Sequence, residues 1–183
     1  MLSLAENPTM LPQGVSTLTD LKGQWWVAHT KARAEKAFAW DLASRGVAYF
    51  LPMLERVRFS GGRKRHLLMP MFSSYVFFCG DRDARYQALT TNRLCQVIEV
   101  TEQTRFVDEL HGIERALFGN AELEIYPHAT LGKRCRFISG PFVGVEGVVV
   151  QRGELNRVVL QISVLGQGVS LNVHPDMLVA IDE

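Results

Sequence analysis

The sequence predicts an α+β protein: a four-stranded antiparallel sheet with flanking helices, followed by a small five-stranded β-barrel. Two observations predict this division. Up to residue 118, aromatic and β-branched runs alternate with segments whose apolar residues have helical spacing. From residue 131 onward, the chain contains short β runs separated by turn residues. A length of 183 residues, 47% of them hydrophobic, is enough for two such cores.

The first domain is predicted to fold as strand, helix, strand, hairpin, strand, short helix, strand and helix. Its opening strand is aromatic and β-branched, and the next segment is rich in alanine and ends before Gly46. Elements in this order pack as one antiparallel sheet with helices on one face. The expected ranges are 25–30, 32–45, 47–52, 55–68, 74–78, 81–92, 94–100 and 104–118.

The segment 55–68 predicts a protruding basic hairpin. Gly61-Gly62 is a turn signal between two arms that can form strands. On the first arm, Arg56 and Arg58 have the alternate spacing that puts side chains on one strand face. A run of three basic residues follows the turn.

Composition and charge divide the chain into parts. The first part is rich in Pro, Gly, Ser and Thr, which predicts a loosely ordered leader. Residues 25–118 contain 14 Lys and Arg against 10 Asp and Glu, a net charge of +4, whereas residues 131–183 contain 5 of each. We therefore expect any nucleic-acid contact in the first domain. The expected parts are a flexible leader over 1–22, a first domain over 23–118, a linker over 119–130 and a barrel over 131–183.

Several classes of protein are excluded or disfavoured. The sequence has no GxSxG, P-loop, HExxH or GxGxxG motif, and its five histidines are scattered without metal-ligand spacing. We therefore expect no catalytic residues, no metal and no cofactor. The three cysteines are far apart, no apolar run approaches the roughly 20 residues that span a bilayer, and the N-terminus lacks signal-peptide features. These features predict a reduced, cytoplasmic protein without membrane contact.

Three segments carry a resemblance to a known family. GKRCRFISGPFVGVEGVVV, over 132–150, is similar to the Gly-Pro-Phe-x-Gly-x-x-Gly-x-Val signature of KOW domains, which are small SH3-like barrels. WWVAHTKARAEKA and PMFSSYVFF resemble the first strand, first helix and central strand of the N-terminal domain of the NusG/RfaH transcription factors. The basic hairpin lies between them, as in that family. Ser74 stands where the family usually has Gly or Asn, and the leader is long, which suggests a specialised paralogue.

The resemblance implies a monomeric adaptor that binds the clamp helices of RNA polymerase, suppresses pausing or termination, and acts in transcription antitermination. The implied polymerase-binding residues are His29, Tyr75 and Phe77. By alternation Tyr75 and Phe77 share one face of their strand. The alternative is that these rings pack beneath the helices and Val76 and Phe78 face outward.

The resemblance also implies DNA contacts, including the non-template strand. The basic run Arg63, Lys64 and Arg65 forms one candidate group. The other lies around the end of the short helix, and the alternative there is an ordinary solvated helix end. That second group is Arg85, Thr91, Asn92 and Arg93.

For the KOW domain, the resemblance implies docking of a small-subunit ribosomal protein, of termination factor Rho, or of both. The candidate residues are Phe142, Ile162, Val164 and Leu165, with barrel core as the alternative for Ile162 and Val164. The density of Val and Ile predicts a stable barrel rather than helices. The alternative function is a ribosome-associated, KOW-type RNA-binding protein.

Overall fold

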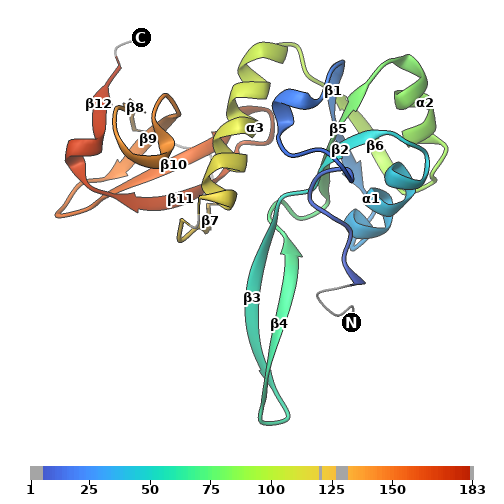
Figure 1. Ribbon diagram of the computed structural model, residues 1–183, viewed down its shortest axis with the longest axis horizontal. Coiled ribbons are helices and arrows are strands. Elements are labelled where there is room, and N and C mark those ends of the chain that lie inside the picture. Colours follow the sequence, from blue (N-terminus) through green and yellow to red (C-terminus); the bar gives the residue numbers. More distant parts are fainter. Residues whose placement is uncertain (1–5, 120, 127–131, 182–183) are drawn as a thin grey trace. The chain divides into compact units, whose positions relative to one another are not determined.

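A computed structural model describes residues 6–119, 121–126 and 132–181 (Figure 1). It divides into two compact units, Met1–Thr101 and Glu102–Glu183. The α+β class predicted from the sequence is confirmed. No helix among the described residues is long and apolar enough to cross a membrane.

The first unit is built on a four-stranded antiparallel sheet, as predicted. The strand order is β2-β5-β1-β6, so the first strand of the chain lies inside the sheet. Its side chains are apolar in a run rather than alternating, which fits a strand covered on both faces. The strands are β1 (Gln24–Thr30), β2 (Ala48–Phe50), β5 (Tyr75–Gly80) and β6 (Leu94–Glu99).

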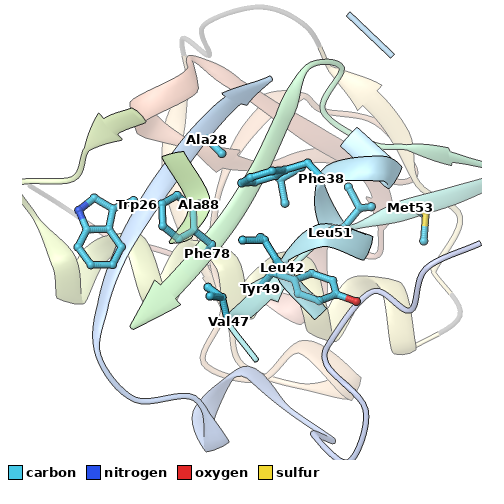
Figure 2. Packing of buried hydrophobic residues seen from close by; sticks show 12 residues of the cluster. Trp26, Ala28, Phe38, Leu42, Val47, Tyr49, Leu51, Met53, Phe78 and Ala88 are labelled. Carbon is cyan, nitrogen blue, oxygen red and sulfur yellow. The ribbon is translucent and has the colours of Figure 1, made fainter. Parts of the chain in front are cut away.

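Two helices, α1 (Glu35–Ser44) and α2 (Arg82–Leu89), supply apolar side chains to the core on one face of this sheet. Figure 2 shows Phe38 and Leu42 of α1 gathered with Phe78 of β5. Phe78 stacks on Trp26, with ring centroids 5.3 Å apart. The N-terminus of α2 is capped by Asp81, whose Oδ1 accepts a hydrogen bond from the backbone N–H of Ala84 at 2.9 Å.

The predicted hairpin is a separate two-stranded sheet, β3 (Met53–Ser60) paired with β4 (Arg63–Pro70). It extends away from the four-stranded sheet (Figure 1). Gly61 and Gly62 have φ of 59° and 74°, the left-handed conformations that a tight two-residue hairpin turn requires.

The leader is more ordered than expected over the residues that the structure describes. Leu11 and Leu18 are buried, and the carbonyl of Met10 accepts a hydrogen bond from the backbone N–H of Leu51 at 2.8 Å. The Tyr49 hydroxyl lies 3.1 Å from Thr9 Oγ1. Apolar side chains placed between the polar residues are therefore buried against the first unit over 6–22. Residues 1–5 lie outside the described part.

The second unit contains a six-stranded antiparallel sheet rather than the expected five strands. The order is β12-β8-β9-β10-β11-β7. The added strand, β7, comes from the expected linker and pairs with β11, Ser170 opposite Glu124. Linker residues 120 and 127–130 are not described. The strands are β7 (Glu124–Tyr126), β8 (Lys133–Phe137), β9 (Glu146–Gln151), β10 (Asn156–Ile162), β11 (Gln167–Val173) and β12 (Leu178–Ala180).

An ion-pair network joins β8 to β9 on the surface of this unit. The carboxylate of Glu146 lies 2.6 Å from a guanidinium nitrogen of Arg136 and 2.7 Å from one of Arg134. The hydrogen bond from Arg136 lowers the pKa of Glu146, partly opposed by desolvation and reinforced by Arg134.

Helix α3 (Gln103–Phe118) groups with the second unit, whereas the expected boundary placed it in the first domain. It contacts β10 and two 3-10 turns, η3 (Gly140–Phe142) and η4 (Ser163–Leu165). At η4, Glu109 accepts a hydrogen bond from the backbone N–H of Ser163 at 2.9 Å. Next to η3, Arg115 donates to the carbonyl of Val143 at 2.6 Å.

Candidate functional site

The register of the hairpin sorts its basic residues onto two faces. Arg58 is directly opposite Arg65, and Ser60 is opposite Arg63. Because paired residues of an antiparallel ladder share a face, four exposed arginines form one row on one face of the ribbon. We call Arg56, Arg58, Arg63 and Arg65 the arginine row. Lys64, expected to act together with Arg63 and Arg65, lies on the opposite face.

The opposite face carries an exposed aromatic ring. Phe59 is 72% exposed, and its cross-strand partner Lys64 places Nζ 5.7 Å from the centre of the ring. Val57 is exposed on the same face, opposite His66, whose Nδ1 contacts the carboxylate of Glu55. This face is therefore mixed apolar and charged, while the other carries the arginine row together with Leu67 and the exposed Met69.

The alternation of β5 is as predicted. Val76 and Phe78 belong to the core beneath the helices, and Tyr75 and Phe77 point to the other face of the sheet. The ring of His29 stacks on Tyr75, its partner across the strands, with centroids 5.0 Å apart and planes at 24°. His29 and Tyr75 are both half-buried.

Phe77 is fully buried, so its position differs from that of the other two expected polymerase-binding residues. It makes an edge contact with Phe72, with centroids 5.7 Å apart, and a tilted contact with Phe50 at 6.4 Å. Of the expected trio, the structure brings His29 and Tyr75 together at the surface and covers Phe77.

Ser74, the residue before Tyr75, fixes the start of β5 through its backbone conformation and hydrogen bonds. Ser74 has φ of 65°, a left-handed conformation that costs a non-glycine residue roughly 1–3 kcal/mol. Its backbone N–H donates to Oε1 of Glu35 at 2.6 Å, and its carbonyl accepts from the N–H of Thr30 at 2.8 Å. The sequence has Ser74 at a position where Gly or Asn is usual in the family, but no local pattern in the sequence identifies Glu35 as its partner.

The expected DNA-reading residues after α2 occupy a loop that the rest of the unit holds in place. Lys31 Nζ donates to the carbonyl of Asn92 at 2.7 Å, and Asn92 has φ of 58°. Arg93 Nε donates to Asp41 of α1 at 2.8 Å. Thr91 Oγ1 donates to the carbonyl of Ala88 within the end of α2. The structure thus brings Thr91, Asn92 and Arg93 together.

Arg85, the fourth of these residues, lies on α2 and is half-buried. Its Nε is buried and has no hydrogen-bond partner among the described residues. Sequence reasoning missed the groups that fix this loop, above all Lys31 and Asp41. Only their contacts across 61 and 52 residues identify them.

In the second unit, the four expected partner-binding residues divide into two pairs. Phe142 and Ile162 are buried, and Phe142 packs edge-on against Phe137 with centroids 5.4 Å apart. Val164 is 38% exposed and Leu165 is half-buried. Although α3 contacts η4, Val164 and Leu165 keep exposed area that Phe142 and Ile162 lack, so they are the accessible pair.

A four-stranded sheet with an inserted basic hairpin, followed by an all-β sheet, defines a two-unit α+β protein. A family model described as "Transcription termination factor nusG" matches residues 23–125, more than half of the 183 residues. The chain belongs to the NusG family of transcription factors. The match ends before most of the second sheet.

Two solved structures align with most of the length of the chain at low identity. The structure described as "Domain interaction in Thermotoga maritima NusG" has 19% identity and a TM-score of 0.46, and the match covers 88% of this chain and 98% of that chain. "Crystal Structure of MjSpt4:Spt5 complex conformation B" has 15% identity and a TM-score of 0.30, with 87% and 97% covered. Among curated proteins, no match is found.

Proposed function

We propose that this protein binds the clamp helices of RNA polymerase across its main cleft during transcript elongation and suppresses pausing or termination. The observation that carries the proposal is the stacked, half-exposed pair of His29 and Tyr75 in a NusG-family domain. Rigid aromatic side chains of this kind supply apolar contact area at low entropy cost and are typical of interface hot spots. The bond from Ser74 to Glu35 supports the pair by fixing the start of the strand.

DNA contacts form the second part of the proposal. The arginine row would hold phosphates, since guanidinium groups pair with phosphate oxygens in a bidentate way. The loop of Thr91, Asn92 and Arg93 would meet the displaced non-template strand, where hydroxyl, amide and guanidinium groups can bond base edges. The net positive charge of residues 25–118 supports both contacts.

The second unit would act as a KOW-type docking module for a small-subunit ribosomal protein or for Rho. Val164 and Leu165, which keep exposed area, would make that contact. The protein would then work as a cytoplasmic monomer through binding rather than catalysis, by joining polymerase to a second machine.

The test is binding of the full-length protein to a reconstituted elongation complex. The double variant His29→Ala/Tyr75→Ala is expected to bind at least about tenfold more weakly, a loss of about 1.4 kcal/mol. Tyr86→Ala is the matched control, because Tyr86 is an exposed aromatic residue on α2 outside the proposed surface. The control is expected to bind like the wild type.

Equal affinity of the double variant and the control would contradict the proposed docking surface. A wild-type protein that does not bind polymerase but co-purifies with ribosomes would instead favour the ribosome-associated, RNA-binding alternative.

A further inference from the structure

The arginine row forms no ion pair with any residue that the structure describes. Its four arginines are exposed. Arg58 and Arg65 are directly opposite each other, an arrangement that destabilises a β ladder. The row therefore does not serve the fold of the hairpin, and a polyanionic ligand would remove the repulsion.

The spacing of the row fits a phosphate backbone. Residues two apart on a strand are roughly 7 Å apart, which is close to the separation of neighbouring phosphates along an extended nucleic-acid strand. Arg56 and Arg58 on β3, and Arg63 and Arg65 on β4, have this separation along their strands. Each strand of the ribbon can thus follow neighbouring phosphates.

The exposed ring of Phe59 indicates that the ligand also has a flat group that can stack on it. A ring that is 72% exposed near the tip of a hairpin buries little on folding, so its apolar face is free for a flat partner. The ammonium group of Lys64 lies over one face of the ring, 5.7 Å from its centre, so the other face is the one open to a partner. Nucleic-acid bases stack on such rings, but a base is accessible only where it is unpaired. The apolar side chains on this face are too few, and too interrupted by Lys64 and His66, to enter a lipid surface.

We infer that the β3–β4 hairpin binds single-stranded nucleic acid with both faces, holding phosphates on the arginine row and stacking an unpaired base on Phe59. The inference deepens the DNA contact of the proposed function and rests on it. A flexible strand can follow one face and turn a base around the hairpin onto the other. A duplex keeps its bases stacked inside and offers phosphates alone, so the hairpin prefers single strands.

The experiment measures binding of the full-length protein, without polymerase, to fluorescent oligonucleotides at low salt. Single-stranded DNA, single-stranded RNA and duplex DNA of equal length are compared, and the first two arms show which sugar is preferred. Phe59→Ala is expected to weaken single-strand binding about fivefold or more, as loss of one stacked base does, and to leave duplex binding unchanged. Tyr86→Ala removes another exposed aromatic ring, 62% exposed against 72% for Phe59, and is expected to change neither.

The double variant Arg58→Ala/Arg65→Ala tests the other face. It is expected to weaken binding of all three oligonucleotides and to reduce the salt dependence on single strands by about 0.7 per lost phosphate contact. The control is Arg152→Ala, an exposed arginine of the second unit, which is expected to change neither quantity. Circular dichroism checks that each variant is folded.

Three results would overturn the inference: equal losses on duplex and single strands for Phe59→Ala, no loss for the arginine variant, or no measurable binding at low salt. If polyglutamate at matched charge concentration displaces the oligonucleotide, and Phe59→Ala has no effect on binding, the ligand of the hairpin is an acidic protein instead. Binding of the same variants to the elongation complex is measured as well. These variants leave the His29 and Tyr75 surface unchanged, so variants that still bind polymerase show that only the inference about the hairpin has failed, and not the proposed function.

Discussion

Replacing Glu35 with alanine is expected to lower the free energy of unfolding of the first unit. Glu35 is 8% exposed, and its carboxylate accepts a hydrogen bond from the backbone N–H of Ser74 at 2.6 Å, where the chain has φ of 65°. A hydrogen bond to a charged group contributes about 1.5–3 kcal/mol. Because Ser74 is half-buried, water can replace part of the bond, so the expected loss is about 1–2 kcal/mol. Glu35→Gln keeps an acceptor oxygen and is expected to cost about half as much.

Urea unfolding followed by tryptophan fluorescence measures this loss in one unit alone, because all three tryptophans, Trp25, Trp26 and Trp40, lie in the first unit. With an m-value of roughly 1–3 kcal/mol/M, the unfolding midpoint of the alanine variant should fall by about 0.3–2 M. Glu55→Ala is the control, because it removes a carboxylate whose ion pair is half exposed to solvent. Equal midpoints for Glu35→Ala and Glu55→Ala would refute the role assigned to Glu35.

Three further predictions concern reactivity, pH and the packing of α3. Burial raises the pKa of Cys79 to about 11 and also raises that of Cys135, whereas Cys95 is exposed. An aromatic disulfide reagent at pH 8 should therefore modify only Cys95 in the native protein and all three thiols in urea. The lowered pKa of Glu146 means that its ion pairs stabilise the second unit above the ordinary carboxyl pKa and are lost as pH falls through the lowered value. Glu146→Gln should remove that part of the acid sensitivity, as measured by urea unfolding between pH 3 and pH 6. Arg115→Ala deletes donors to two carbonyls beside η3 and should speed amide hydrogen exchange in the last turns of α3, and unchanged exchange would count against the packing described here.

The local patterns of the sequence predicted most of the first unit correctly. Period-two alternation separates Tyr75 and Phe77 from Val76 and Phe78, because neighbouring side chains of a strand point to opposite faces. The Gly61-Gly62 pair predicts the hairpin turn, since both positions need positive φ. The same two-residue turn implies that Lys64 lies opposite the arginine row, although sequence reasoning treated the three basic residues after the turn as one patch.

Contacts between distant segments were decided only by the tertiary structure. The pairing of Glu35 with Ser74 and of Lys31 with Asn92 depends on which strand ends meet, and no local pattern encodes that. The sixth strand of the second sheet, the packing of α3 on η3 and η4 and the burial of Phe77 depend in the same way on which surfaces come together. Residue type and spacing determine the conformation that a segment prefers and the face that it offers, whereas the partner of that face follows from the packing of the whole chain.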